Sequence, residues 1–151
     1  MKKAIITLLV STAAFAQSTS AKDALDALRG LNSAIDAGIN LRDYTKRLAD
    51  AKIVVDRFAA DQPKDPQRAA LEEIMRVYVL VGKAFAARAG AYENTTPLGE
   101  AVVADSKLES CEGVAAVVKQ SKSNAHDVGI RLIARPQPLL QCAAAKLAEI
   151  K

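Results

Sequence analysis

The sequence of 151 residues predicts an all-α protein, a small up-and-down bundle of four to five helices with one disulfide. Apolar residues recur every three or four positions through most of residues 21–92, which is typical of amphipathic helices. The apolar fraction of 50% contains much alanine, and aromatic residues make up only 4%. Small apolar side chains allow close helix packing, whereas a sheet protein of this size is richer in β-branched and aromatic residues.

The N-terminus has the pattern of a secretory signal peptide. Two lysines precede an apolar run at residues 4–10, and the triplet AFA at residues 14–16 is a cleavage site of the A-x-A type. The apolar run is far shorter than the roughly 20 residues that cross a bilayer, so we expect no membrane span in the mature chain.

We therefore predict a signal peptide at residues 1–16, with cleavage after Ala21 as the second choice. A single helical-bundle domain then covers residues 22–151. A signal of this Sec type indicates export to the periplasm of a bacterial cell or secretion from it.

The first helix is predicted over residues 21–37, where leucines recur on one face. Ser20 and Asp23 have the spacing of a capping box, and Gly38 is suited to the left-handed turn at a helix end. A second striped segment begins at Asn40 and continues to Asp61. Because the connection is so short, we expect these two helices to form an antiparallel hairpin.

The third helix is predicted over residues 66–92, after a turn at residues 61–66. Asp65 is placed to cap it, and Pro66 suits a first helical position. Its middle is apolar on more than one face, which indicates a central helix covered on several sides. The residues expected to point inward are Leu71, Ile74, Met75, Tyr78, Val81, Phe85 and Tyr92.

The pattern weakens between residues 93 and 138. We expect a helical turn at 98–103, a short helix at 108–119 and a polar loop at 120–127, and the alternation at 129–138 is too short to assign. Pro136 and Pro138 fit only the start of a final helix.

The two cysteines, Cys111 and Cys142, predict an intramolecular disulfide. An oxidising compartment favours the bond, and the C-x-x-C spacing of a redox or metal pair is absent. An intermolecular bridge and buried free thiols are the alternatives. A catalytic cysteine is the weakest interpretation, because nothing in the sequence brings the single histidine, His126, to either sulfur.

The charge pattern gives no indication of nucleic-acid binding. Twenty-one basic and 17 acidic residues give a net charge of +4, and removal of the two lysines in the signal leaves +2. The basic residues are spread along the chain and do not form a stripe with aromatics.

Local motifs of catalysis and cofactor binding are absent from the sequence. One histidine and two cysteines are too few for a zinc site, and no phosphate loop, nucleophile elbow or C-x-x-C-H haem motif occurs. We therefore expect no metal, no cofactor and no enzymatic activity, although an enzyme with residues scattered over several helices is left open.

Met75 and His126 are the only side chains in the mature chain that resemble a ligand pair for a non-covalent haem. The competing interpretation places Met75 in the core and His126 in a solvated loop. A small carrier of haem or another apolar ligand in the periplasm is therefore the second functional hypothesis.

The first hypothesis is an exported, non-enzymatic binding or interaction module of unknown role. Its contact surface is predicted on the extra apolar width of the third helix, where an unknown protein partner or a second copy would bind. The alternative is that the C-terminal segments cover this surface. The residues concerned are Val77, Val79, Ala84, Ala87 and Ala91.

Overall fold

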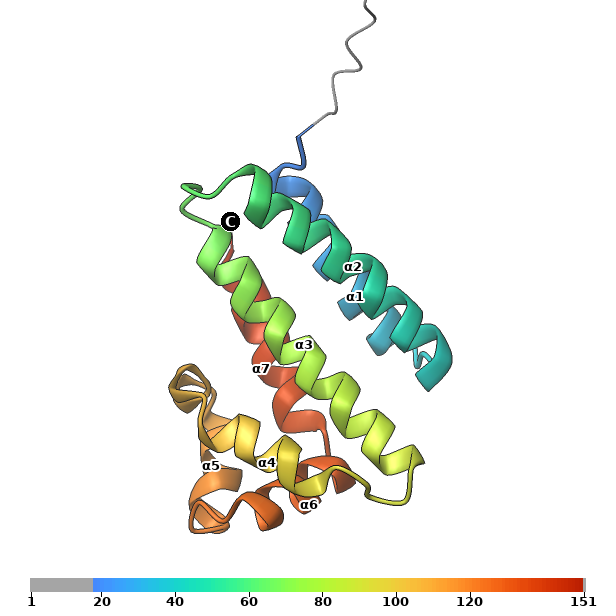
Figure 1. The fold of residues 1–151 in the computed structure, drawn as a ribbon, viewed down its shortest axis with the longest axis vertical. Helices are drawn as coiled ribbons and strands as arrows, with labels where there is room; N and C mark the ends of the chain where they lie inside the picture. The colour runs from blue at the N-terminus through green and yellow to red at the C-terminus, as the bar shows by residue number, and fades with distance from the viewer. Residues whose placement is uncertain (1–17, 151) are drawn as a thin grey trace, which may run out of the picture.

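The computed structural model describes residues 18–150, and all of its regular elements are helical (Figure 1). The predicted signal peptide lies outside the described residues. The elements are α1 (Ala21–Asp36), α2 (Leu41–Asp61), α3 (Arg68–Ala89), α4 (Thr95–Val103), the 3₁₀ helix η1 (Ser106–Ser110), α5 (Glu112–Gln120), α6 (Ala125–Ala134) and α7 (Gln137–Glu149). The all-α fold is confirmed, but the predicted count of four to five helices is too low, because residues 18–150 hold seven α-helices.

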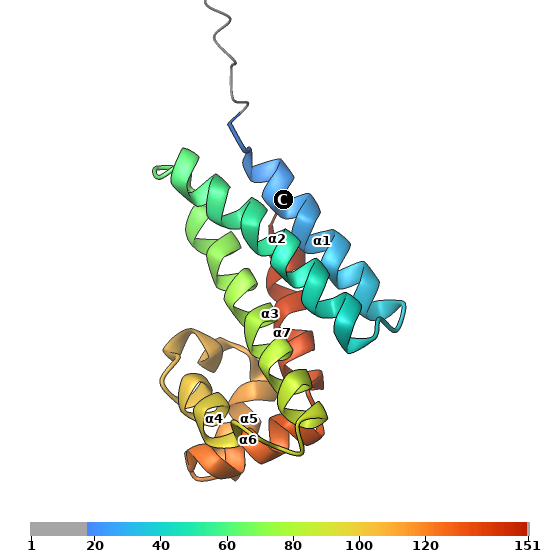
Figure 2. The same cartoon turned by 45° about the vertical axis from the view of Figure 1, so that its right-hand side comes forward.

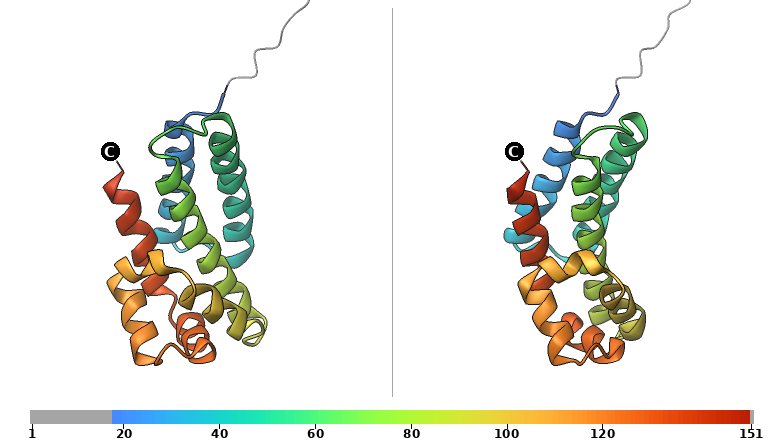
Figure 3. Two further views of the ribbon diagram at one scale, coloured as in Figure 1. Left: turned by 60° about the vertical axis from the view of Figure 1, so that its left-hand side comes forward. Right: turned by 90° about the vertical axis from the view of Figure 1, so that its left-hand side faces the viewer.

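The helices form two regions, which Figures 1 and 2 show one above the other. In the first, which we call the bundle, α1 contacts α2, α2 contacts α3, and α3 contacts α7. In the second, which we call the cap, α4, α5 and α6 gather at the carboxyl end of α3 (Figure 3), and η1 extends to its amino-terminal half, where Lys107 pairs with Glu73. The up-and-down order therefore continues from α3 to α7, with the cap inserted between them.

The start of α1 forms as the sequence predicts. The Ser20 side chain accepts a hydrogen bond from the Asp23 amide at 3.2 Å, and the Asp23 carboxylate accepts one from the Ser20 amide at 2.9 Å. Gly38 has a φ of 83°, a conformation that disfavours other residues, and it turns the chain into the α1–α2 hairpin.

The third helix is shorter than predicted at both ends. Asp65 accepts a hydrogen bond from the Gln67 amide, so it closes a turn before α3 begins. At the other end Ala91 and Tyr92 have φ values of 54° and 69°, which are incompatible with helix. Tyr92, which the sequence predicts to point inward, is 46% exposed.

Hydrogen bonds from two tyrosines connect α1, α2 and α3. Tyr44 of α2 donates a hydrogen bond to the backbone carbonyl of Tyr78 in α3 at 2.7 Å, and the Tyr78 hydroxyl donates to Asn32 of α1 at 2.9 Å. Gly82 makes room for the Tyr44 ring, since a Cβ there would lie 3.2 Å from the Tyr44 Cε1 atom. Burial raises the pKa of both tyrosines above the usual value, so the hydroxyls remain protonated donors.

The cap is built on a close crossing of α4 and α6. A Cβ on Gly99 would lie 1.7 Å from the Ala125 carbonyl oxygen, and a Cβ on Gly129 would lie 2.0 Å from that of Thr95. The backbones touch because neither glycine has a side chain.

The sequence interpretation of the cap needs several corrections. The helix predicted at 108–119 is interrupted at Cys111, which separates η1 from α5, and the turn predicted at 98–103 is the longer helix α4. The predicted polar loop at 120–127 is only the turn at 121–124, because Asn124 caps α6 by accepting a hydrogen bond from the Asp127 amide. The unassigned segment after it is mostly helix, and Arg135 with Pro136 separates α6 from α7. The prolines lie at the start of α7, as predicted.

Candidate functional site

The disulfide joins the cap to the bundle. Cys111 lies between η1 and α5, Cys142 lies on α7, and their Cα atoms are 5.3 Å apart. The predicted intramolecular bond is therefore confirmed, and the alternatives of an intermolecular bridge and free thiols are removed. Both cysteines are nearly buried, so the bond lies inside the contact between the cap and α7.

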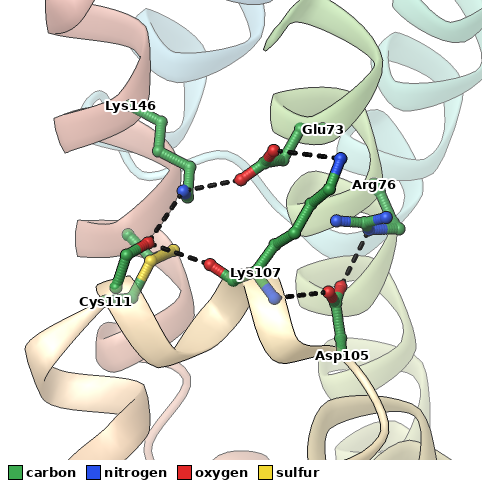
Figure 4. Close-up of polar contacts among 8 residues, drawn as sticks. Glu73, Arg76, Asp105, Lys107, Cys111 and Lys146 are labelled. Atoms are coloured by element: carbon green, nitrogen blue, oxygen red, sulfur yellow. Dashed lines mark hydrogen bonds and ion pairs between the residues drawn. A yellow bond between two sulfur atoms is a disulfide. The ribbon is translucent and has the colours of Figure 1, made fainter. Parts of the chain in front are cut away.

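Beside the disulfide, Glu73 of α3 binds two lysines that come from different elements (Figure 4). Its carboxylate lies 2.6 Å from the Lys146 ammonium of α7 and 3.5 Å from that of Lys107 in η1. Lys146 also donates to the Ser110 hydroxyl at 3.1 Å, directly before Cys111. One carboxylate thus connects α3, η1 and α7 at the position of the covalent bond.

A second ion pair extends this cluster along α3. Arg76 lies 2.9 Å from the carboxylate of Asp105, which is only 11% exposed. Asp105 also accepts a hydrogen bond from the Lys107 amide at 3.1 Å and so caps η1. We call Glu73, Arg76, Asp105, Lys107 and Lys146 the junction cluster (Figure 4).

Two influences act on the pKa of Glu73 in the junction cluster, burial and the two neighbouring lysines. Burial alone would raise the pKa of this carboxyl. The hydrogen bond and charge of Lys146, with those of Lys107, outweigh burial, and the pKa falls below its usual value. The carboxylate is therefore charged near neutral pH and holds both lysines.

An apolar hollow of about 300 Å³ opens between α4, η1 and α5, and we call it the cap hollow. Three of its apolar residues, Val103, Ala115 and Val118, are at least partly exposed, so solvent reaches the walls. Asp105, Glu109 and Lys119 add charged groups to the lining. The apolar lining residues are Val102, Val103, Leu108, Val114, Ala115 and Val118.

The interaction surface predicted on the third helix is not exposed as a patch. Val77, Ala84 and Ala87 are each at most 3% exposed, because α7, α4 and α6 pack against α3 in addition to α1 and α2. Val79 is half-buried, and Ala91 is exposed in the turn after the helix. Three of the five residues are therefore covered, which agrees with the alternative that the sequence leaves open.

The two predicted haem ligands lie in different regions. Met75 is 4% exposed and lines a groove that only α2 and α3 residues form. His126 lies in the first turn of α6, exposed, with its Nδ1 atom 3.2 Å from the Thr96 hydroxyl of α4. Neither residue is part of the cap hollow.

The junction cluster and the cap hollow were not found from the sequence. Glu73, Asp105 and Lys146 are far apart along the chain, and no local motif connects them. The sequence assigns the valines of the cap hollow to separate short helices. Only the contacts between elements bring them together, and a single sequence carries no signal of those contacts.

Comparisons with known proteins do not identify the chain. No protein-family model, no curated protein and no solved structure matches it. Within residues 18–150 no group of three or more histidine, cysteine or acidic side chains is arranged to hold a metal ion. None of the described helices combines the length and the apolarity needed to cross a bilayer. The functional assignment therefore depends on the geometry of the cap.

Proposed function

We propose that the protein is an exported binding module that acts through the cap hollow and performs no covalent chemistry. The observation that carries this proposal is an apolar hollow of about 300 Å³, open to solvent and formed by three elements. An exposed apolar recess of this kind is a common site for an anchoring side chain of a partner protein.

The walls of the cap hollow are held rigidly, which favours binding. Asp105 lines the hollow and is fixed by Arg76 of the bundle. Two walls of the cap hollow are formed by η1 and α5. Cys111 lies directly between these two helices and is bonded to Cys142 of α7. A preformed recess avoids the ordering cost that a flexible surface pays on association.

The occupant that suits this hollow best is a large apolar side chain of a partner protein. Its volume is at the lower end of the range of about 300–1,000 Å³ for small-molecule sites. Charged groups of both signs, Asp105, Glu109 and Lys119, would then contact polar groups beside the anchor.

A carrier of a small apolar molecule is the second candidate, because the same lining would accept one. The haem form of this hypothesis has no support from the positions of Met75 and His126, which lie in different regions.

Export follows from the predicted signal peptide and agrees with the disulfide, which persists in an oxidising compartment. The start of the described chain supports cleavage after Ala16. Thr19 donates a backbone hydrogen bond to Asp61 of α2 at 2.9 Å, and Ser20 caps α1. Cleavage after Ala21 would remove both interactions, so we expect the mature chain to begin at Gln17.

The test compares two neighbouring alanines of α5. Ala115 lines the cap hollow, whereas Ala116 is exposed and does not. We expect Ala115→Trp to fill the hollow and Ala116→Trp to leave it open, with both variants folded by circular dichroism. Native mass spectrometry of each protein, recovered from the exporting cell without reduction, reports the mass of any bound protein or small molecule.

A protein partner retained by the wild type and Ala116→Trp but lost from Ala115→Trp supports the binding module. A small retained mass with the same dependence supports the carrier instead. Equal retention by all three proteins would contradict both forms of the proposal, because binding would then not use the cap hollow.

A further inference from the structure

A second hollow, of about 600 Å³, lies between α5, α6 and α7. Arg131 of α6 and Arg135 directly after that helix line it, and so do Gln120, Gln137 and Gln141. We call it the arginine hollow. It uses different residues of α5 from the cap hollow, so it is a separate surface.

The arginine hollow differs in its charge from the cap hollow and from three other hollows, which lie at the α1–α2 turn, at the disulfide and beside Met75. Elsewhere each hollow that contains a basic residue also contains carboxylates, as at the α1–α2 turn, where Lys46 and Arg47 share the lining with Asp43 and Asp50. The arginine hollow contains two guanidinium groups and no carboxylate.

These guanidinium groups are also poorly paired. Arg131 donates one long hydrogen bond of 3.5 Å to the neutral Gln120 side chain. The Arg135 guanidinium makes no hydrogen bond or ion pair with any residue of 18–150. Both side chains are exposed and line the same hollow, so an anion bound there would pair with both.

We infer that the arginine hollow binds a small organic anion through a phosphate or carboxylate group. The planar guanidinium presents paired N–H donors that match either group, and the three glutamine amides supply further neutral donors. Val117, Ala134 and Pro138 complete the lining with apolar surface, which suits the organic part of the ligand. The volume lies within the usual range for small-molecule sites.

The probe for this site is phenyl phosphate, titrated into the mature disulfide-bonded protein by calorimetry at low ionic strength, where screening is weak. We expect saturable binding at one site. The double variant R131Q/R135Q should weaken it by at least about tenfold for each arginine. The matched control R57Q/R88Q removes the same charge from exposed arginines that line none of the five hollows, and it should bind as the wild type does.

Three further arms sharpen the result. Benzoate in place of phenyl phosphate distinguishes a carboxylate site from a phosphate site. Ala134→Glu places a carboxylate inside the hollow and should abolish binding in a folded protein, which keeps the test valid if R131Q/R135Q does not fold. Inorganic phosphate should bind more weakly than phenyl phosphate, and equal affinity would overturn the organic part of the inference.

The site would be overturned if the wild type bound neither phenyl phosphate nor benzoate. It would also be overturned if R131Q/R135Q and R57Q/R88Q lost the same affinity. This test is independent of the cap hollow. Ala115→Trp should leave phenyl phosphate binding unchanged, and R131Q/R135Q should leave the occupant of the cap hollow bound.

Discussion

In the bundle, α1, α2 and α3 contact one another along stripes of large side chains, whereas the cap combines smaller buried leucines, valines and an isoleucine with a glycine crossing, and a disulfide and ion pairs join it to the bundle. Tyr44, Phe58 and Tyr78 are fully buried between long helices. In the cap, Gly99 and Gly129 form the closest approach, and Cys111 provides the covalent bond to α7. The cap therefore has a few special contacts, the glycine crossing and the disulfide, in addition to its share of the apolar core.

This difference matters for function, because the cap forms the cap hollow and lines the arginine hollow together with α7. A binding surface on short helices keeps its shape only if those helices are fixed to a rigid scaffold. The disulfide and the junction cluster provide that attachment at α3 and α7. Single changes at these points should affect the cap far more than changes of similar size affect the bundle.

The largest effect is expected from loss of the disulfide. The double variant C111A/C142A should lower the free energy of unfolding by about 3.5 kcal/mol, because the bond closes a loop between positions 31 residues apart. Urea unfolding measures the loss. Hydrogen exchange should show lost protection in η1, α5 and α7, with α1 and α2 nearly unchanged.

Reduced wild-type protein serves as the control and should reproduce the exchange pattern of the variant. A loss of protection that is uniform over bundle and cap would contradict the division of stability between them, since it would show a single cooperative unit.

The second largest effect is expected at the glycine crossing. Gly99→Ala would place a Cβ 1.7 Å from the Ala125 carbonyl oxygen, so α4 and α6 must separate. The free energy of unfolding should fall by about 3 kcal/mol, the upper part of the range for overpacking. Differential scanning calorimetry at one scan rate measures the change.

Gly30→Ala in α1 is the matched control, because no atom lies within 4 Å of a Cβ there. That variant should be more stable by about 0.5–1 kcal/mol, the gain for alanine over glycine in a helix. If Gly99→Ala lowered the free energy of unfolding by less than about 1 kcal/mol, the loss would fall below the usual range for overpacking and would contradict the close backbone contact.

A smaller effect is expected in the bundle, at the hydroxyl of Tyr44. Tyr44→Phe removes the hydrogen bond to the Tyr78 carbonyl but keeps the ring, so we expect a loss of about 1 kcal/mol in chemical unfolding. Tyr92→Phe changes an exposed hydroxyl and should stay within about 0.5 kcal/mol of the wild type. Equal losses in the two variants would rule out a specific role for the buried bond.

The bundle was largely predictable from the sequence, whereas the cap was not. In α1 and α2 the apolar stripe runs over 16 and 21 residues. Ser20 and Gly38 mark the two ends of α1 with recognised capping patterns. The pairing of Cys111 with Cys142 followed from the expected compartment and the number of cysteines. Each of these predictions depends on a local pattern or a count.

The cap lacks such patterns for physical reasons. Helices α4 and α6 have only nine and ten residues, so their stripes cover fewer than three turns. Glycine is disfavoured in a helix interior, yet Gly99 and Gly129 lie inside helices because the partner backbone occupies the space of a side chain. The same contact between distant segments explains why Val77, Ala84 and Ala87 are buried by elements that the sequence did not define.

The last effect on stability is expected at Glu73, whose ion pairs join the cap to the bundle. Glu73→Gln removes the charge that holds Lys146 and Lys107 and should lower the free energy of unfolding at pH 7 by about 1 kcal/mol. Glu72→Gln is the matched control, since Glu72 pairs with Arg68 on the exposed face of α3, and it should change stability by a few tenths of a kcal/mol.

The pH dependence identifies the cause of this effect. Because the folded pKa of Glu73 lies below its unfolded value, the ionised carboxylate stabilises the protein above the unfolded pKa of about 4.3. The stabilisation is lost as the pH falls through the folded pKa. The difference between wild type and Glu73→Gln should therefore be constant from pH 7 to about pH 5 and should shrink below that, as urea unfolding at several pH values would show. A difference as large at pH 3 as at pH 7 would mean that Glu73 acts through packing and not through its charge.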